Sequence, residues 1–174
     1  MPDNTLWVAA LTAGTAVLAS WVTSRGNANA ARLQAEAASE SQRTARQREA
    51  RREAYAAVID KAVAIGELYW KIPEATRITE PEARRAEILR LREQIRDVYA
   101  ALLRCVQVVT LEGPDDVAEA AAALDEATPS TARLMRAMAE GDPAAERQLT
   151  EETRAYWPAL TEFIARASKA VRTM

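Results

Sequence analysis

The 21 residues from Asn4 to Ser24 carry no charged side chain, and this stretch constrains the fold more than any other part of the sequence. At about 1.5 Å of rise per residue, it would form a helix roughly 30 Å long, which matches the hydrocarbon core of a bilayer. Trp7 and Trp21 bracket its apolar centre, so their indole rings would rest at the two headgroup layers. The sequence therefore predicts an N-terminal transmembrane helix within residues 1–25.

The charges on either side of this stretch predict its orientation. Only Asp3 and the amino terminus precede it, whereas Arg25 and six further arginines follow it before residue 53. By the positive-inside rule, we expect a single-pass protein of the cell membrane with its N-terminus outside and its C-terminal domain cytoplasmic. Trp7, Trp21 and Arg25 are the expected residues of the membrane interface.

Two alternatives to an uncleaved anchor stay open. Val17-Leu18-Ala19 before Ser20 resembles the small-residue cleavage site of a signal peptide, although no basic residue precedes the apolar run. A buried or partner-docking helix is the second alternative, because Ala and Thr keep the stretch only moderately hydrophobic.

A face of small residues runs along the predicted span. Thr12, Ala16 and Ser20 recur at four-residue spacing, which is the pattern that lets two transmembrane helices approach closely. The span is therefore a candidate surface for homo-oligomerisation. The other interpretation is that small residues coincide by chance in an alanine-rich helix.

Residues 26–49 predict a helical stalk, because they are rich in Ala, Gln, Ser, Arg and Glu and contain few large apolar residues. A loose coiled coil with a second copy is the alternative.

The run from Ser41 to Glu53 also holds the one plausible binding patch of this region. Three interpretations compete for it: solvated helix surface, contact with anionic lipid or an acidic partner, and contact with nucleic acid. The last is disfavoured, because acidic residues are interspersed, aromatic residues are missing from the run and the net charge of the chain is -2. The arginines concerned are Arg43, Arg46, Arg48, Arg51 and Arg52.

The rest of the chain predicts an all-α fold. Only five glycines and seven prolines interrupt it, and apolar residues from position 50 onward recur at three- and four-residue intervals. We expect an antiparallel four-helix bundle over residues 50–174. Its helices are expected over 50–71, 81–111, 115–141 and from 143 onward. Lys71-Ile72-Pro73 should end the first, Thr79 should cap the second, Thr128-Pro129-Ser130 should break or kink the third, and Pro158 should kink the last.

The side chains that usually carry chemistry are scarce. The chain has no histidine, and its single cysteine, Cys105, lies at a core position of the most apolar helix, where inert packing is expected. The five glycines are isolated and form no phosphate-binding loop. We therefore expect no catalytic residue, no metal and no cofactor. An enzyme that uses Ser, Thr, Tyr or carboxylates alone is the remaining alternative.

Trp70 and Trp157 allow two interpretations. Trp70 lies near the end of the first bundle helix, and Trp157 lies next to Pro158. Both rings would belong to the core in the simpler interpretation. An exposed pair would instead mark a groove for a partner.

Three stretches in this order, WVAALTAGTAVLASWVTSRG, RREAYAAVIDKA and VVTLEGPDDVAEAAAALDEA, resemble uncharacterised single-span membrane proteins of high-GC actinobacteria. The resemblance implies a membrane anchor with a cytoplasmic helical bundle, and no activity. The function expected from the sequence is a non-catalytic adaptor that binds the bilayer and a cytoplasmic protein. The alternatives are a membrane-active or transfer-related accessory protein of a mobile element, and a membrane-tethered nucleic-acid binder.

Overall fold

The computed structural model describes the backbone of residues 3–129 and 131–173, and the side chains of residue 34 and of residues 36–129 and 131–173. Every element in this part of the chain is helical, as expected for an all-α protein. The chain divides into two compact units, residues 1–47 and 48–174. Each unit is described by itself.

The first unit belongs to α1, Asp3–Thr76. All side chains of residues 36–47 are exposed, the arrangement of a solvated stalk. Within the part of the chain whose side chains the structure describes, no helix holds a stretch long and apolar enough to cross a membrane. The side chains of the predicted span lie outside the described residues, and so do the proposed interface and packing residues within it. The membrane anchor therefore stays a prediction.

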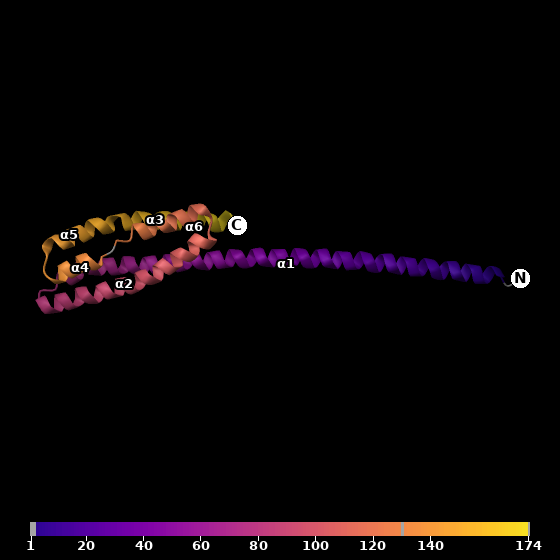
Figure 1. Cartoon of the computed structure of the whole chain (residues 1–174), viewed down its shortest axis with the longest axis horizontal. Helices are drawn as coiled ribbons and strands as arrows, with labels where there is room; N and C mark the ends of the chain where they lie inside the picture. The colour runs from indigo at the N-terminus through magenta and orange to yellow at the C-terminus, as the bar shows by residue number, and fades with distance from the viewer. Residues whose placement is uncertain (1–2, 130, 174) are drawn as a thin grey trace. The chain divides into compact units, whose positions relative to one another are not determined.

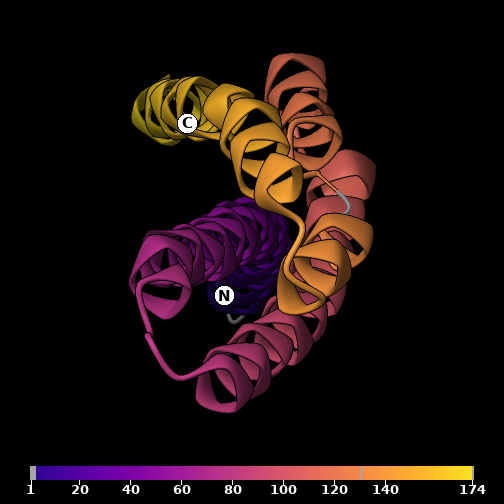
Figure 2. The ribbon, with the colours of Figure 1, turned by 90° about the vertical axis from the view of Figure 1, so that its left-hand side faces the viewer.

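The second unit is a helical bundle (Figure 1). After α1 come α2, Pro81–Glu112, then α3, Asp115–Glu126, and α4, Ala132–Ala139. The chain then returns through α5, Pro143–Glu152, the 3-10 turn η1, Thr153–Ala155, and α6, Tyr156–Thr173. Seen end-on, α1, α2, α3 with α4, and α5 with α6 surround a common core (Figure 2). The third and fourth rods of the bundle are each built from two helices.

Contacts between the rods fix their directions. Arg51 lies where α1 enters the bundle, and its Nε donates to the carbonyl of Glu112 at the C-terminal end of α2, 2.8 Å away. Arg166 Nη1 in α6 donates to the carbonyl of Asp116 at the start of α3, 3.1 Å away. Sequential rods are therefore antiparallel. The core between them includes the fully buried side chains of Leu102, Tyr156 and Phe163, each worth about 1.5–3 kcal/mol on burial.

The first bundle helix ends later than predicted, and its neighbour has a different cap. Helix α1 continues through Pro73 to Thr76, because Ile72 and Ala75 still bury against the core and outweigh one lost backbone hydrogen bond. Glu80, rather than Thr79, caps α2 by accepting from the backbone N–H groups of Glu82 and Ala83. Pro81 occupies the first turn as expected.

The third and fourth rods are also interrupted. The predicted break near 128–130 is complete, so α3 and α4 are separate helices. The predicted kink at Pro158 is wrong, because the irregular turn falls earlier, at Thr153–Ala155. Pro158 lies instead in the first turn of α6, where a missing N–H leaves no helical hydrogen bond unmade.

Candidate interaction site

A row of residues, most of them exposed or half-buried, follows the line where α1 lies beside α5 and α6. We call this surface the seam. On α1 its residues recur at three- and four-residue spacing: Ala56, Ile59, Val63, Gly66 and Trp70. Across from them, the residues of η1 and α6 are Thr153, Trp157, Thr161, Ile164 and Ser168.

Large apolar side chains of the seam face solvent. Trp70 is 71% exposed, Trp157 and Val63 are each 41% exposed, and Ile164 is 36% exposed. The centroids of the two indole rings are 6.3 Å apart, with the rings tilted by 43°. The interpretation of both tryptophans as core residues is therefore wrong, and the fold brings them together as an exposed pair.

Gly66 makes room for one of these rings. A Cβ atom at this position would lie 2.5 Å from Cη2 of Trp157, far inside van der Waals contact. The six-membered ring of Trp157 therefore lies directly against the backbone of α1. A glycine inside a helix costs about 1 kcal/mol relative to alanine, and this close approach gives a structural reason for it.

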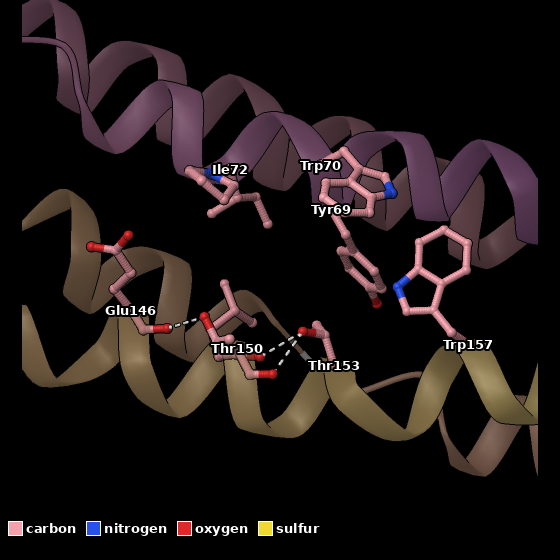
Figure 3. A pocket seen from close by; sticks show the side chains of 9 residues that line it. Tyr69, Trp70, Ile72, Glu146, Thr150, Thr153 and Trp157 are labelled. Atoms are coloured by element: carbon pink, nitrogen blue, oxygen red, sulfur yellow. Dashed lines mark hydrogen bonds between the residues drawn. The ribbon is translucent and has the colours of Figure 1, made fainter.

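A cavity of about 160 Å³ opens beside the tryptophan pair. Tyr69 and Trp70 line it from α1, and Thr150, Thr153 and Trp157 line it from the opposite rod (Figure 3). The threonine hydroxyls donate to carbonyls of their own rod, those of Glu146 and Leu149, at 3.0 and 2.9 Å. The cavity thus combines an aromatic wall, formed by Tyr69, Trp70 and Trp157, with the polar side chains of Glu146, Thr150 and Thr153.

The tyrosines beneath the seam hold the two rods together. The rings of Tyr69 and Tyr156 meet edge to face, with centroids 5.3 Å apart. The hydroxyl of Tyr156 donates to the carbonyl of Ala62, whereas the buried hydroxyl of Tyr69 has no protein partner among the described residues. Burial raises the pKa of both tyrosines, so neither supplies a proton or a nucleophile near neutral pH.

A second cavity, of about 340 Å³, lies at the other end of the seam. Tyr55 and Ile59 of α1 line it together with Val171 of α6, and Arg52 and Arg172 add two positive charges. Both arginines are exposed. Two arginines therefore flank the apolar side chains of the seam at this end.

The five arginines proposed as a binding patch do not form one face. Arg51 is half-buried and donates to the carbonyl of Glu112, so it stabilises the end of α2. The other four are exposed, but at 3.6 residues per turn the five positions spread over about two thirds of the circumference of α1. Nothing in this arrangement favours nucleic acid over solvent. The four exposed arginines are Arg43, Arg46, Arg48 and Arg52.

The remaining candidates for chemistry among the described residues are Cys105 and the acidic side chains. Cys105 is half-buried and packs against the core, beside the edge of the bundle rather than inside it. Among the described side chains, no group of three acidic, cysteine or histidine residues lies close enough to hold a metal ion. The acidic pair Asp115 and Asp116 lies in the first turn of α3, where negative charges favour the helix dipole.

The sequence pointed to the tryptophan pair as a candidate groove, but it did not predict the other residues of the seam. The signal for Val63 and Ile164 is a second apolar stripe beside the core stripe, visible only once the core positions are known. Gly66 carries a weaker signal, an isolated glycine within a strong helix.

Comparison with known proteins adds no relative. The chain matches no known family model, and no curated protein or solved structure is significantly similar to it. The resemblance to actinobacterial single-span proteins therefore stays a prediction, and a functional assignment rests on the seam.

Proposed function

We propose that this protein is a membrane-anchored, non-catalytic interaction module that binds helices of other protein chains along the seam. The observation that carries the proposal is the exposure of Trp70, Trp157, Val63 and Ile164 on one two-helix face. Isolated apolar residues on a surface are ordinary, but a contiguous row rimmed by polar residues is typical of protein–protein contact sites.

The spacing of the row favours a helical partner. Side chains at three- and four-residue intervals on two neighbouring helices form a groove that accepts the apolar stripe of another helix. The aromatic cavity at one end suits an inserted apolar side chain, because Tyr69, Trp70 and Trp157 form one wall of it. Tryptophan is also the residue type most enriched among the energetic centres of interfaces.

The anchor is supported by sequence. The uncharged residues 4–24, flanked by tryptophans and followed by arginines, have the length and charge asymmetry of a single span. In this arrangement the bundle works at the inner face of the membrane. Its low content of catalytic residue types agrees with a binding role.

Photocross-linking tests the interaction surface. A photoreactive amino acid is placed at Val63 on the seam, and at exposed Gln94 on α2 as the matched control, in the full-length protein within its own membranes. We expect a discrete protein adduct from position 63 and none from position 94. Equal labelling at both positions, or no adduct at position 63, would overturn the proposal.

Protease accessibility tests the anchor and its orientation. A C-terminally tagged full-length protein is treated with protease in intact and in lysed spheroplasts. Protection that is lost only on lysis is the expected result. Digestion in intact spheroplasts would place the bundle outside, and release of a shortened soluble form would show that the N-terminal segment is cleaved.

A further inference from the structure

The two outer edges of the seam carry opposite charges. On α1, Glu53, Asp60, Glu67 and Glu74 recur every seven residues and are all exposed. Positions seven residues apart lie nearly in line along a helix, and this line lies on the side of the seam away from the core. We call it the acidic rim. The outer edge of α5 and α6 carries the exposed residues Arg147, Arg154 and Arg172, which we call the basic rim.

Most of these charges have no counterion within the bundle. Asp60 pairs with the adjacent Lys61 at 2.7 Å, and Arg154 pairs with Glu151 at 3.1 Å on its own rod. Across the side chains that the structure describes, no ion pair involves the remaining five residues. These are Glu53, Glu67, Glu74, Arg147 and Arg172.

The acids and arginines occur at the same three heights along the bundle. Gly66 lies against Trp157, which sets Glu67 level with Arg154. Thr76 donates to the carboxylate of Glu146 at 3.1 Å, which sets Glu74 level with Arg147. Arg52 and Arg172 line the second cavity together, so Glu53, which is next to Arg52, lies level with Arg172. Within one bundle, however, each acid and its arginine lie on opposite edges of the seam.

We propose that the occupant of the seam is a second copy of this chain, related by a two-fold axis parallel to the helices. This inference rests on the proposed function of the seam as a helix-binding surface. In such a dimer, α1 of each copy faces α6 of the other at the same height. The acidic rim of one copy then meets the basic rim of the other. Glu53, Glu67 and Glu74 meet Arg172, Arg154 and Arg147 of the second copy.

The alternative two-fold arrangement is disfavoured by the same charges. An axis across the helices would place α1 against α1, with one acidic rim facing the other, and like charges in register repel. It would also send the two copies of α1 in opposite directions. In the parallel arrangement both copies of α1 enter from the same end, which lets both predicted spans enter one membrane.

The size of the seam is sufficient for a specific contact. From residue 52 to residue 73 it is about 30 Å long, and two packed helices are about 20 Å wide. Two copies would together bury about 1,200 Å², the lower limit for stable specific interfaces. A dimer of this size depends on complementarity, so its rim charges should have a measurable effect on pairing.

Charge reversal tests the pairing. In full-length protein with Cys105→Ser, one copy carries E67R and E74R with E53C, and the other carries R147E and R154E with R172C. A bismaleimide cross-linker joins the two introduced cysteines only when the rims meet. Neither variant should pair with itself, because each has two rims of the same sign. Mixed together, the two variants should cross-link as efficiently as the E53C and R172C copies with native rims.

We expect reversed rims to lower cross-linking about tenfold when opposed to native rims, and the mixed variants to restore it. The matched control is E93R, at an exposed position of α2 outside the seam, which should leave cross-linking unchanged. Absence of cross-linking between native rims, or failure of the mixed variants to regain it, would overturn the inference. Thermal melts of each variant show that the bundle is still folded.

The photocross-linking at Val63 separates this inference from the proposed function. An adduct with the mass of two copies supports both. An adduct with a different protein leaves the seam a helix-binding site but overturns the second copy as its occupant. No adduct at all overturns both.

Discussion

Two adjacent pairs of aromatic residues have opposite environments. Tyr69 and Tyr156 are buried and meet edge to face beneath the seam, whereas Trp70 and Trp157, one residue further along each helix, are exposed above it. One residue turns a helix by about 100°, so neighbouring positions face different surroundings. The tyrosines join the rods of one bundle, and the exposed tryptophans form part of the surface that we propose binds another chain.

Truncation of one residue from each pair should separate stability from binding. Tyr156→Ala removes a ring that is fully buried, and we expect a loss of about 3–5 kcal/mol in the free energy of unfolding. Trp70→Ala should change it by less than about 0.5 kcal/mol, because the side chain is mostly exposed. Urea titration of the two variants measures both values. Similar losses would show that the tryptophan also supports the core.

High pH should act on the buried tyrosine pair, whose rings ionise, and not on the tryptophan pair. Burial raises the pKa of Tyr69 and Tyr156 above the value of about 10 in the unfolded chain. Below pH 10 both states keep these protons, so stability is independent of this pair. Above pH 10 the unfolded state releases its protons first, and stability should fall by up to about 1.4 kcal/mol per pH unit for each tyrosine.

Urea titrations between pH 9 and pH 11 measure this dependence. The double variant Tyr69→Phe with Tyr156→Phe should have a flatter profile, because its rings carry no ionisable hydroxyl. An unchanged slope in the double variant would assign the alkaline loss to other groups.

The two tyrosine hydroxyls should differ from each other. Tyr156→Phe removes a hydrogen bond to the carbonyl of Ala62, with an expected cost of about 1 kcal/mol. Tyr69→Phe removes a buried hydroxyl that has no protein partner, so stability should stay the same or rise slightly. Thermal unfolding at neutral pH compares the two. A larger loss of stability from Tyr69→Phe than from Tyr156→Phe would contradict the assignment of the stabilising hydrogen bond to Tyr156.

The smallest expected effect concerns the contact between the ring of Trp157 and the backbone of α1 at Gly66. Gly66→Ala forces Trp157 away from α1, but it also gains about 1 kcal/mol of helix propensity, so the net change in stability should be below about 1 kcal/mol. Tryptophan fluorescence should shift to longer wavelength as the ring moves into water. In a Trp157→Ala background the same substitution should be stabilising, and an equal effect in both backgrounds would contradict the contact.

The sequence predicted the helical elements more reliably than their ends. The start of α2 at Pro81 and the break after α3 follow from proline and from strong apolar periodicity. The end of α1 was misplaced because Ile72 and Ala75 are buried by other rods, and that burial carries the helix past Pro73. The break at Thr153–Ala155 was missed because no proline or glycine marks it.

The candidate site was only partly visible in the sequence. Trp70 and Trp157 are aromatic residues near helix ends, but they are 87 positions apart in the chain, so their proximity depends on the pairing of two rods. The opposed rims were missed for the same reason. Glu67 and Arg154 look like ordinary surface charges until the fold places them at one height on two edges.

The sequence by itself determined the all-helical class, the boundaries at Pro81 and Gly113, and the scarcity of catalytic side chains, because backbone propensity and composition are local properties. Only the tertiary structure decided which apolar stripe of α1 is covered. Periodicity shows that a helix has an apolar face, but it does not show whether another rod of the same chain is available to bury it. In this protein the core stripe is buried by three other rods, and the seam remains open.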